Sequence, residues 1–396
     1  MYGLCGGAHR NSQGHTASGR RIMECFTPEQ LPALSTLARE FAICDFWFSS
    51  IPGPTWPNRL FVHCATSGGF VVNRMQQYYM PTIFEALESE GHSWRVYFHD
   101  VPQALASARL RRDRRLQSFA KIDKFYHDAS AGTLPAYSFI EPQYFNFLAW
   151  KANDQHGGHS MAQGDTLIAH VYEALRANDA AWPHTLLVIE YDEHGGFFDH
   201  VSPPYDGLDV EGQPVAIPNP DSVSSAAPTF DFQRLGVRVP AVVVSPWIAR
   251  GTVDHRIRDH CAVPATLRRV FRLPRSLTLR DAVISSVEDL ATLPAMRTDT
   301  PTVLPRNPQI NKTREFELRT LDVERAPEAA LPRADGPGAR EPLNDLQRSL
   351  LELVDSLDPV LESRIISRAA DRETEESAAA DARRKMDTIL ARGADR

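Results

Sequence analysis

Two acidic residues and a histidine directly follow an apolar run in the middle of the chain. The run at 186–190 has the composition of a strand buried on both faces of a parallel sheet, and Asp192, Glu193 and His194 come next, ahead of two glycines. Open α/β sheets bind ligands just beyond the carboxyl ends of their strands. Two adjacent carboxylates repel each other unless a cation or a basic partner lies between them. The pattern therefore favours a functional site, and its alternative is a polar, solvated turn.

Thr55 is a second candidate, in the segment GPTWPN. It lies just ahead of a helix predicted at 58–66. The N–H groups and the positive dipole end of a helix N-terminus favour an alkoxide, and they also bind phosphate. The alternative is that Thr55 is only the N-cap of this helix, with Pro57 in the first turn.

Further candidates come from histidines that lie near loops and helix starts. His156 lies in a polar, glycine-bearing loop before a predicted helix. Asp259 and His260 also precede a predicted helix, where such a pair can be a cap, a ligand pair or a salt bridge. His200 repeats the acid–histidine pattern shortly after the central motif. Each loop histidine is equally compatible with a plain surface position.

Strands and helices alternate along the first 273 residues. The sequence predicts strands at 42–48, 94–98, 137–141, 186–190 and 239–246. It predicts helices at 27–41, with Thr27 as N-cap, and at 58–66, 104–124, 164–178 and 263–271. This alternation indicates an α/β layered fold with a largely parallel sheet.

Composition excludes several classes of protein. The chain has 396 residues, 42% of them hydrophobic, and a net charge of −7, which gives no basic footprint for nucleic acid. Five cysteines without a CxxC pair suggest neither a disulfide framework nor a zinc ribbon. No apolar run approaches membrane-spanning length, and the polar start lacks a secretory core. As written, the chain is expected to be cytoplasmic. A true start further upstream would instead allow a secreted or periplasmic protein.

The change in composition after about residue 300 divides the chain. We predict a catalytic domain over 1–300, with an N-terminal segment that is incomplete. An extension over 301–366 contains one amphipathic helix, with leucines at helical spacing from Leu343 to Leu357. The charged, alanine-rich stretch 367–396 is predicted to be a frayed tail.

Four segments together resemble one known family. The segments are GPTWPNRLF, NDQHGGHSMAQGD, YDEHGGFFDHVSPP and RVPAVVVSPWIARGTVDHRIRDHCAVPATLRRVF. They resemble motifs of the bacterial phosphoesterase family that holds phosphatidylcholine-specific phospholipase C and related acid phosphatases. The segments occur in the family's order and cover roughly residues 26 to 273. Such a combination is far more specific than any single motif.

The resemblance implies a fold and a set of site residues. The implied fold is an alkaline-phosphatase-like three-layer α/β sandwich with a mostly parallel central sheet. Thr55 matches the hydroxyl residue that takes the phosphoryl group, and His156 matches a histidine that faces the phosphate or the leaving group. Asp192 and Glu193 match ligands of a divalent metal ion. Positions with an implied substrate-binding role are Asn58, His194, His200, Asp259 and His260.

The sequence departs from the family at its start. An ENRSFD-type motif, whose Glu and Asn are metal ligands in the family, does not occur in the chain. The resemblance implies a metal-dependent, phospholipase C-like hydrolase of phosphodiesters that acts through a phospho-threonine, on a phosphate ester such as a phospholipid. The alternatives are an acid phosphatase-type phosphomonoesterase and a degenerate, non-catalytic member that binds a phosphorylated ligand.

Overall fold

The computed structural model describes residues 21–146, 151–205, 207–209, 211–220, 230–308, 343–357 and 375–394. The strands are β1 (Ala42–Cys44), β2 (Trp94–Phe98), β3 (Phe119–Lys121), β4 (Tyr137–Glu141), β5 (Leu187–Glu190), β6 (Ala241–Val244) and β7 (Thr252–Asp254). The α-helices are α1 (Pro32–Glu40), α2 (Thr55–Cys64), α3 (Ile83–Ser89), α4 (Asp113–Leu116), α5 (Ile122–Ala131), α6 (Met161–Arg176), α7 (Ala262–Val270), α8 (Leu279–Val283), α10 (Asp345–Ser356) and α12 (Glu375–Ala394). Short 3₁₀ turns are η1 (Arg21–Met23), η2 (Gln103–Ala106), η3 (Trp182–His184) and η4 (Glu288–Leu290).

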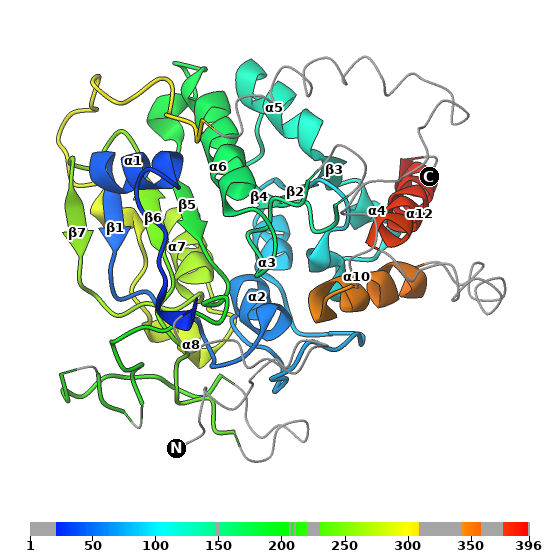
Figure 1. The fold of residues 1–396 in the computed structure, drawn as a ribbon, viewed down its shortest axis with the longest axis horizontal. Coiled ribbons are helices and arrows are strands. Elements are labelled where there is room, and N and C mark those ends of the chain that lie inside the picture. Colours follow the sequence, from blue (N-terminus) through cyan, green and yellow to red (C-terminus); the bar gives the residue numbers. More distant parts are fainter. Residues whose placement is uncertain are drawn as a thin grey trace.

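The strands of the described residues form two sheets. One has the order β5-β6-β1-β7 and the other the order β3-β2-β4. Strand β2 pairs in parallel with both β3 and β4, and β1 pairs in parallel with β7. Strand β6 is antiparallel to both of its neighbours, β1 and β5. In Figure 1, β7, β1, β6 and β5 lie on one side of the molecule, and β4, β2 and β3 lie on the other.

Alternate side chains of β2 point to opposite faces of its sheet, and helices pack on both of these faces. Trp94, Val96 and Phe98 point into one core, shared with α2, α3, α10 and α12. Tyr97 points into a second core, shared with α1, α5 and α6. Buried apolar side chains dominate both cores, which drives the packing of the layers. The α/β layered fold predicted from the sequence is therefore confirmed.

Helix α1 begins later than predicted. The sequence pointed to Thr27 as N-cap, but the helix starts at Pro32, and residues 28–30 form a turn. Proline is tolerated in the first helical turn and needs no amide partner there. The next two amides, of Ala33 and Leu34, donate to the carboxylate of Asp165 in α6, at 2.9 and 2.8 Å. A residue more than 130 positions away thus fixes the start of α1.

The basic stretch 104–124 is not one helix, so this prediction is wrong. It comprises η2, α4, β3 and the start of α5. Arg109, in the turn before α4, and Arg115, within α4, form ion pairs with Glu85 at 2.7 and 3.0 Å. These contacts hold the stretch against α3, and β3 adds itself in parallel to β2.

Two helices of the C-terminal region pack on the core of α2 and α3. Helix α10, predicted from its leucine spacing, buries Leu346, Leu350 and Val354. Within the range predicted as a frayed tail, residues 375–394 form α12, and Met386 and Ile389 of this helix are buried in the same core. Figure 1 shows α10 and α12 beside each other. Residues 309–342 and 358–374, which belong to the predicted extension and tail, lie outside the described residues. The domain boundaries stay a prediction.

None of the helices in the described part of the chain is long and apolar enough to cross a membrane.

Candidate active site

Helix α2 begins at Thr55, which is only 3% exposed. The N-cap position is taken by Pro54, and within the described part of the chain no side chain caps this helix end. The reading of Thr55 as an N-cap is therefore wrong, because the hydroxyl belongs to the first helical residue. The backbone amide of Trp56 donates to Asn73 Oδ1 at 2.9 Å, which satisfies one of the free amides of the first turn.

Asn58 holds the turn that carries Thr55. Its Oδ1 accepts from the amide of Ile51 at 3.1 Å, and its Nδ2 donates to the carbonyl of Gly53 at 2.9 Å. The side chain is fully buried. The carboxamide is thus engaged with the backbone of residues 51–54 and positions the loop before α2. A direct substrate contact of Asn58 stays a prediction.

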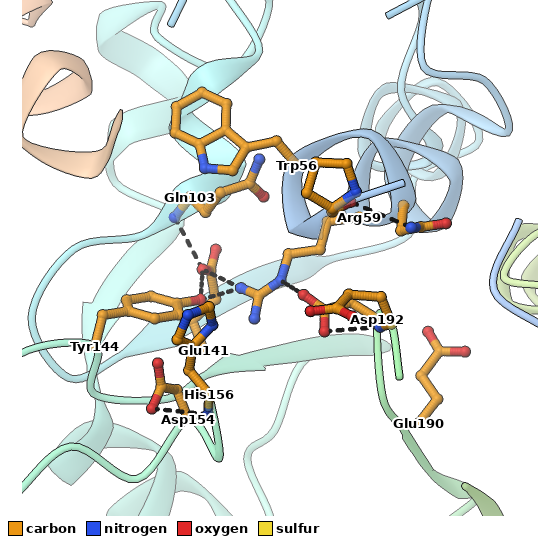
Figure 2. A network of polar contacts seen from close by, with 12 residues as sticks. Trp56, Arg59, Gln103, Glu141, Tyr144, Asp154, His156, Glu190 and Asp192 are labelled. Carbon is orange, nitrogen blue, oxygen red and sulfur yellow. Dashed lines mark hydrogen bonds and ion pairs between the residues drawn. The ribbon is translucent and has the colours of Figure 1, made fainter. Parts of the chain in front are cut away.

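Arg59 joins three elements at the centre of the site (Figure 2). Its Nε donates to Asp192 Oδ2 at 2.9 Å, and its Nη1 lies 3.5 Å from Glu141 Oε2 and donates to the hydroxyl of Tyr144. Although burial opposes its charge, the pKa of Arg59 is raised by these three neighbours. The guanidinium is a permanent cation between the ends of β4 and β5.

Glu141, the last residue of β4, is fully buried and well supplied with donors. Its two oxygens accept from the amides of Gln103 and Ala104, both at 2.9 Å, and the hydroxyl of Tyr144 donates to it at 2.7 Å. Hydrogen bonds to a carboxylate are shorter and stronger than neutral ones. Glu141 and Tyr144 therefore fix one end of the Arg59 guanidinium.

Asp192 and Glu193 follow β5 at its carboxyl end, as predicted. Asp192 Oδ1 accepts from the Glu193 amide at 2.9 Å, and Glu193 Oε2 accepts from the Gly195 amide at 2.7 Å. Burial, and then the neighbouring charge of Asp192, raise the pKa of Glu193 to about 7. Gly195 and Gly196 have φ of +62° and +83°, which explains the glycine pair at this turn.

His260 contacts the backbone of Asp192. Its Nε2 lies 2.8 Å from the carbonyl oxygen of Asp192, and Trp47 Nε1 donates to its Nδ1 at 3.3 Å. A carbonyl only accepts, so Nε2 carries the proton and Nδ1 is the acceptor. Both ring nitrogens of the fully buried His260 are thus engaged with protein groups. Burial raises the pKa of Glu190, whose carboxylate lies 3.5 Å from the same ring.

The loop with His156 approaches the loop with Glu193. A Cβ added to Gly157 would lie 4.0 Å from the carbonyl oxygen of Gly195, so the two glycine-bearing turns lie next to each other. Asp154 anchors the first loop, because its Oδ1 bonds to the Nδ1 of His159 at 2.6 Å. His156 is half-buried and lies on the side of Glu141 and Tyr144 in Figure 2.

Three other predicted residues, His194, His200 and Asp259, do not contact Arg59, Glu141, Tyr144 or Asp192 through any hydrogen bond or ion pair seen among the described residues. His194 Nδ1 donates to the carbonyl of Phe197 at 2.9 Å. The side chain of His200 is 84% exposed. Asp259 is fully buried and pairs with Arg280 Nη1 at 2.7 Å. The structure brings His260 to Asp192, whereas the substrate-binding roles of the other three stay predictions.

Arg59, Glu141 and Tyr144 were not predicted as site residues. Helical spacing offers one signal for Arg59, since it follows Thr55 by four positions and therefore lies on the same face of α2. Glu141 ends a predicted strand, which is the position where α/β sheets bind ligands. Tyr144 carries no such signal, because only the fold brings its hydroxyl to Arg59.

The described residues do not form a complete metal site. Among them, no cluster of three or more His, Cys, Asp or Glu side chains could hold a metal ion. Asp192 and Glu193 are oxygen donors suited to a hard cation, but such a cation takes about six ligands. One Asp192 oxygen is already bound by Arg59, which is itself a cation. These side chains alone therefore do not fit the predicted divalent ion.

Comparison with known proteins gives consistent matches along the chain. The model of the Phosphoesterase family matches residues 6–274. Non-specific phospholipase C6 of Arabidopsis thaliana is 43% identical over 316 residues, which are 76% of this chain and 59% of that protein. Phospholipase C B of Mycobacterium tuberculosis (strain ATCC 25618 / H37Rv) is 30% identical over 295 residues, which are 67% of this chain and 55% of that protein. The chain thus spans less than two thirds of the length of these relatives.

A solved structure titled as a protein in the alkaline phosphatase superfamily from Vibrio parahaemolyticus is also similar. It is 12% identical, with a TM-score of 0.36, over 61% of this chain and 63% of that chain.

Proposed function

The chain belongs to the phosphoesterase family, and from this membership we propose that it hydrolyses phosphodiesters in the manner of a phospholipase C. The observation that carries the proposal is the place of Thr55. A hydroxyl stands at the first residue of α2, one turn ahead of an arginine that bridges Glu141 and Asp192. A substrate phosphate at this helix end meets the positive end of the helix dipole, with the Arg59 guanidinium one turn further along.

The proposed reaction begins with attack of Thr55 Oγ1 on phosphorus. As Oγ1 bonds to phosphorus its proton passes to solvent, the bond from phosphorus to the leaving alkoxide breaks, and the alkoxide takes a proton from His156. A phospho-threonine remains that still carries the second ester group of the phosphodiester. Water then attacks phosphorus and gives one proton to His156, the bond from phosphorus to Thr55 Oγ1 breaks, and Oγ1 takes a proton from solvent. The phosphomonoester is released, and both Thr55 and His156 regain their starting states. Charge on the phosphoryl oxygens is stabilised by the N-terminus of α2.

The other residues of the site hold these groups in place. Asn58 fixes the loop before Thr55, and His260 fixes the backbone of Asp192. Arg59 keeps its place because Glu141 and Asp192 bind opposite parts of its guanidinium. One divalent ion, expected from the sequence, stays a prediction, and no step above depends on it.

Two chromogenic substrates test the proposal. We expect the purified chain to hydrolyse p-nitrophenyl phosphorylcholine faster than p-nitrophenyl phosphate. With the first substrate, rapid acid quenching should trap phosphorylcholine on the peptide that contains Thr55. The reverse preference would indicate a phosphomonoesterase. Binding of phosphocholine without turnover of either substrate would indicate a non-catalytic member. Parallel assays with and without chelator test the metal requirement.

A further inference from the structure

A concave pocket of about 340 Å³ lies apart from the proposed reaction centre. It is bounded by the loop 215–217, by residues 255–257 after β7, and by residues 283–285 at the end of α8. Neither Thr55 nor Arg59 lines it. Ligand sites in proteins commonly have volumes of about 300–1,000 Å³, with apolar walls and a few polar groups. This pocket therefore has the size of a small-molecule site.

Aliphatic side chains from four segments make up the walls. They are Val215, Ile217, Leu235, Ile257, Val283 and Ile284. Leu235 and Ile217 are 1% and 7% exposed, whereas Val283 is 52% exposed, so the pocket leads from the surface to the buried core. Within the described part of the chain, its lining contains no aromatic ring. Aliphatic walls without rings favour an alkyl chain over a ligand that must stack.

Arg280 fixes the floor of the pocket. Its Nη1 pairs with Asp259 Oδ2 at 2.7 Å, its Nε donates to the carbonyl of Pro218 at 2.9 Å, and its Nη2 donates to the carbonyl of Phe232. Arg280 and Asp259 are both fully buried. These contacts join α8 to three other segments and hold the walls in place. A ligand thus meets a pre-formed pocket, which lowers the entropic cost of binding.

The cations of the lining are already neutralised. Arg256 donates to Asp254 at 2.7 Å and to Asp289 at 2.9 Å, and Arg280 is paired at the floor as described. Asp209 adds a carboxylate to the lining. A carboxylate or phosphate ligand would therefore meet paired guanidinium groups and further acids, and it would lose its hydration without a free cation in return. The lining favours a ligand with an uncharged polar group.

Three polar side chains of the lining can bind a hydroxyl group. Among the described residues, the Ser285 hydroxyl has no hydrogen-bond partner. His255 Nδ1 donates to Asp45 Oδ2 at 2.7 Å, and its Nε2 is unengaged in the same part of the chain. Asp209 Oδ1 accepts two backbone amides of its own turn, which leaves Oδ2 as an acceptor. A hydroxyl both donates and accepts, so it complements these groups.

The pocket is joined to the candidate active site through its floor. Asp259 lines the pocket, and the next residue, His260, contacts the carbonyl oxygen of Asp192 at 2.8 Å. Two consecutive residues therefore face the pocket and the site. A ligand in the pocket would lie behind the carboxyl end of β5.

We propose that this pocket binds an uncharged acylglycerol. One alkyl chain lies along the aliphatic walls, and the glycerol hydroxyls bind at Ser285, His255 and Asp209. Hydrolysis of a phospholipid in the manner of a phospholipase C releases a diacylglycerol and a phosphomonoester, so the source of the ligand rests on the proposed function. Binding itself does not, because it is measured without turnover.

Isothermal titration of the full chain with 1-octanoyl-glycerol, below its micelle concentration, tests the proposal. Octanoate has the same chain with a charged head, and glycerol has the head without the chain. We expect 1-octanoyl-glycerol to bind at least about tenfold more tightly than octanoate, and glycerol to show no measurable binding. No binding of 1-octanoyl-glycerol, or tighter binding of octanoate, would overturn the proposal.

Two substitutions place the ligand in the pocket. Ala216 lines the pocket and is exposed, so Ala216→Trp should block it without disturbing the core, and should weaken binding at least about tenfold. Ser285→Ala should weaken it about threefold through loss of one hydrogen bond. The control Ala131→Trp, at the exposed end of α5, should bind as the wild type does. Equal affinity of Ala216→Trp and wild type would show that the ligand binds elsewhere.

Photolabelling of the unmodified chain is independent of any substitution. An acylglycerol with a diazirine in its chain is irradiated with the protein, and labelled peptides are identified by mass spectrometry. We expect label on peptides that contain residues 215–217 or 283–285. Label confined to other peptides would refute the pocket. Assays of p-nitrophenyl phosphorylcholine on the same preparation separate the two proposals. A chain labelled in the pocket but inactive contradicts only the proposed function, and an active chain without this label contradicts only the pocket.

Discussion

The Nε of Arg59 lies 2.9 Å from Oδ2 of Asp192, and this contact joins helix α2 to the end of strand β5. It places a guanidinium beside the first acid of the central motif. The same guanidinium reaches Glu141 at the end of β4. One arginine therefore joins helix α2 to the ends of both strands.

Loss of Arg59 should destabilise the fold. In Arg59→Met, the buried Glu141 and the half-buried Asp192 lose their common cation, so we expect unfolding free energy to fall by about 3 kcal/mol. Arg59→Lys should recover only part of this, because an ammonium cannot bridge two groups as a guanidinium does. Urea unfolding measures both. The control is Arg114→Met, which removes an exposed ion pair with Glu88. This substitution should change the unfolding free energy by less than about 0.5 kcal/mol. Equal losses in Arg59→Met and Arg114→Met would contradict the bridging role.

Thr55→Ala should remove turnover and leave the fold intact. Because the hydroxyl does not cap α2, its loss should lower the melting temperature only slightly, while kcat falls by several orders of magnitude. Thr55→Ser keeps a hydroxyl and should retain activity. Thr166→Ala, which removes a hydroxyl that bonds within α6, is the matched control. More than about a tenth of wild-type activity in Thr55→Ala would show that another group is the nucleophile.

Asp192→Asn and Glu193→Gln test the ligand role that the sequence predicts, which the described residues alone do not complete; under that role each substitution should weaken cation binding. Isothermal titration with divalent ions measures this independently of activity, and each lost carboxylate removes a hard oxygen ligand. Glu211→Gln, at an exposed loop position, should bind cations as the wild type does. Elemental analysis that finds no metal in active wild-type protein would refute the ligand role of both acids.

Acid should destabilise the protein through His63. This side chain is 2% exposed, and neither ring nitrogen has a hydrogen-bond partner among the described residues. Burial, and then the charge of Arg59, lower its pKa to about 3. The unfolded state binds a proton near pH 6.5 and the folded state does not. Stability from this residue is therefore complete above pH 6.5 and is lost as pH falls toward 3, by about 2 kcal/mol at pH 5.

His63→Phe should remove this part of the pH dependence, since the ring already packs between Phe84 and Phe139. Urea unfolding at pH 7 and pH 5 compares the variants, with the exposed His184→Asn as control. An unchanged difference between the two pH values in His63→Phe would mean that His63 is not the sensor.

Asp259→Asn should act on stability rather than on substrate affinity. The carboxylate is fully buried against Arg280, so its neutralisation leaves a buried guanidinium unpaired, at a cost of about 3–5 kcal/mol. Thermal unfolding and KM for p-nitrophenyl phosphorylcholine are measured on the same preparation. A raised KM with an unchanged melting temperature would instead assign Asp259 to the substrate.

Local patterns were sufficient for much of the fold. The predicted strands at 94–98 and 137–141 correspond to β2 and β4, and the apolar run before Asp192 corresponds to β5. These strands can be predicted from the sequence because their signal, a short apolar run or an apolar–polar alternation, depends only on neighbouring residues. The rule that α/β sheets bind ligands at strand ends then placed Asp192 and Glu193 in a site without any knowledge of distant contacts.

Tertiary structure alone decided which groups meet at that site. Arg59 and Asp192 are 133 positions apart, and Glu141 reaches Arg59 only because β4 and α2 pack on the same core. The stretch 104–124 has helical composition, yet its arginines pair with Glu85 and β3 pairs with β2. Helix propensity is worth only tenths of a kcal/mol per residue, whereas burial of Phe119, which accompanies the pairing of β3 with β2, is worth more, so long-range packing overrides propensity.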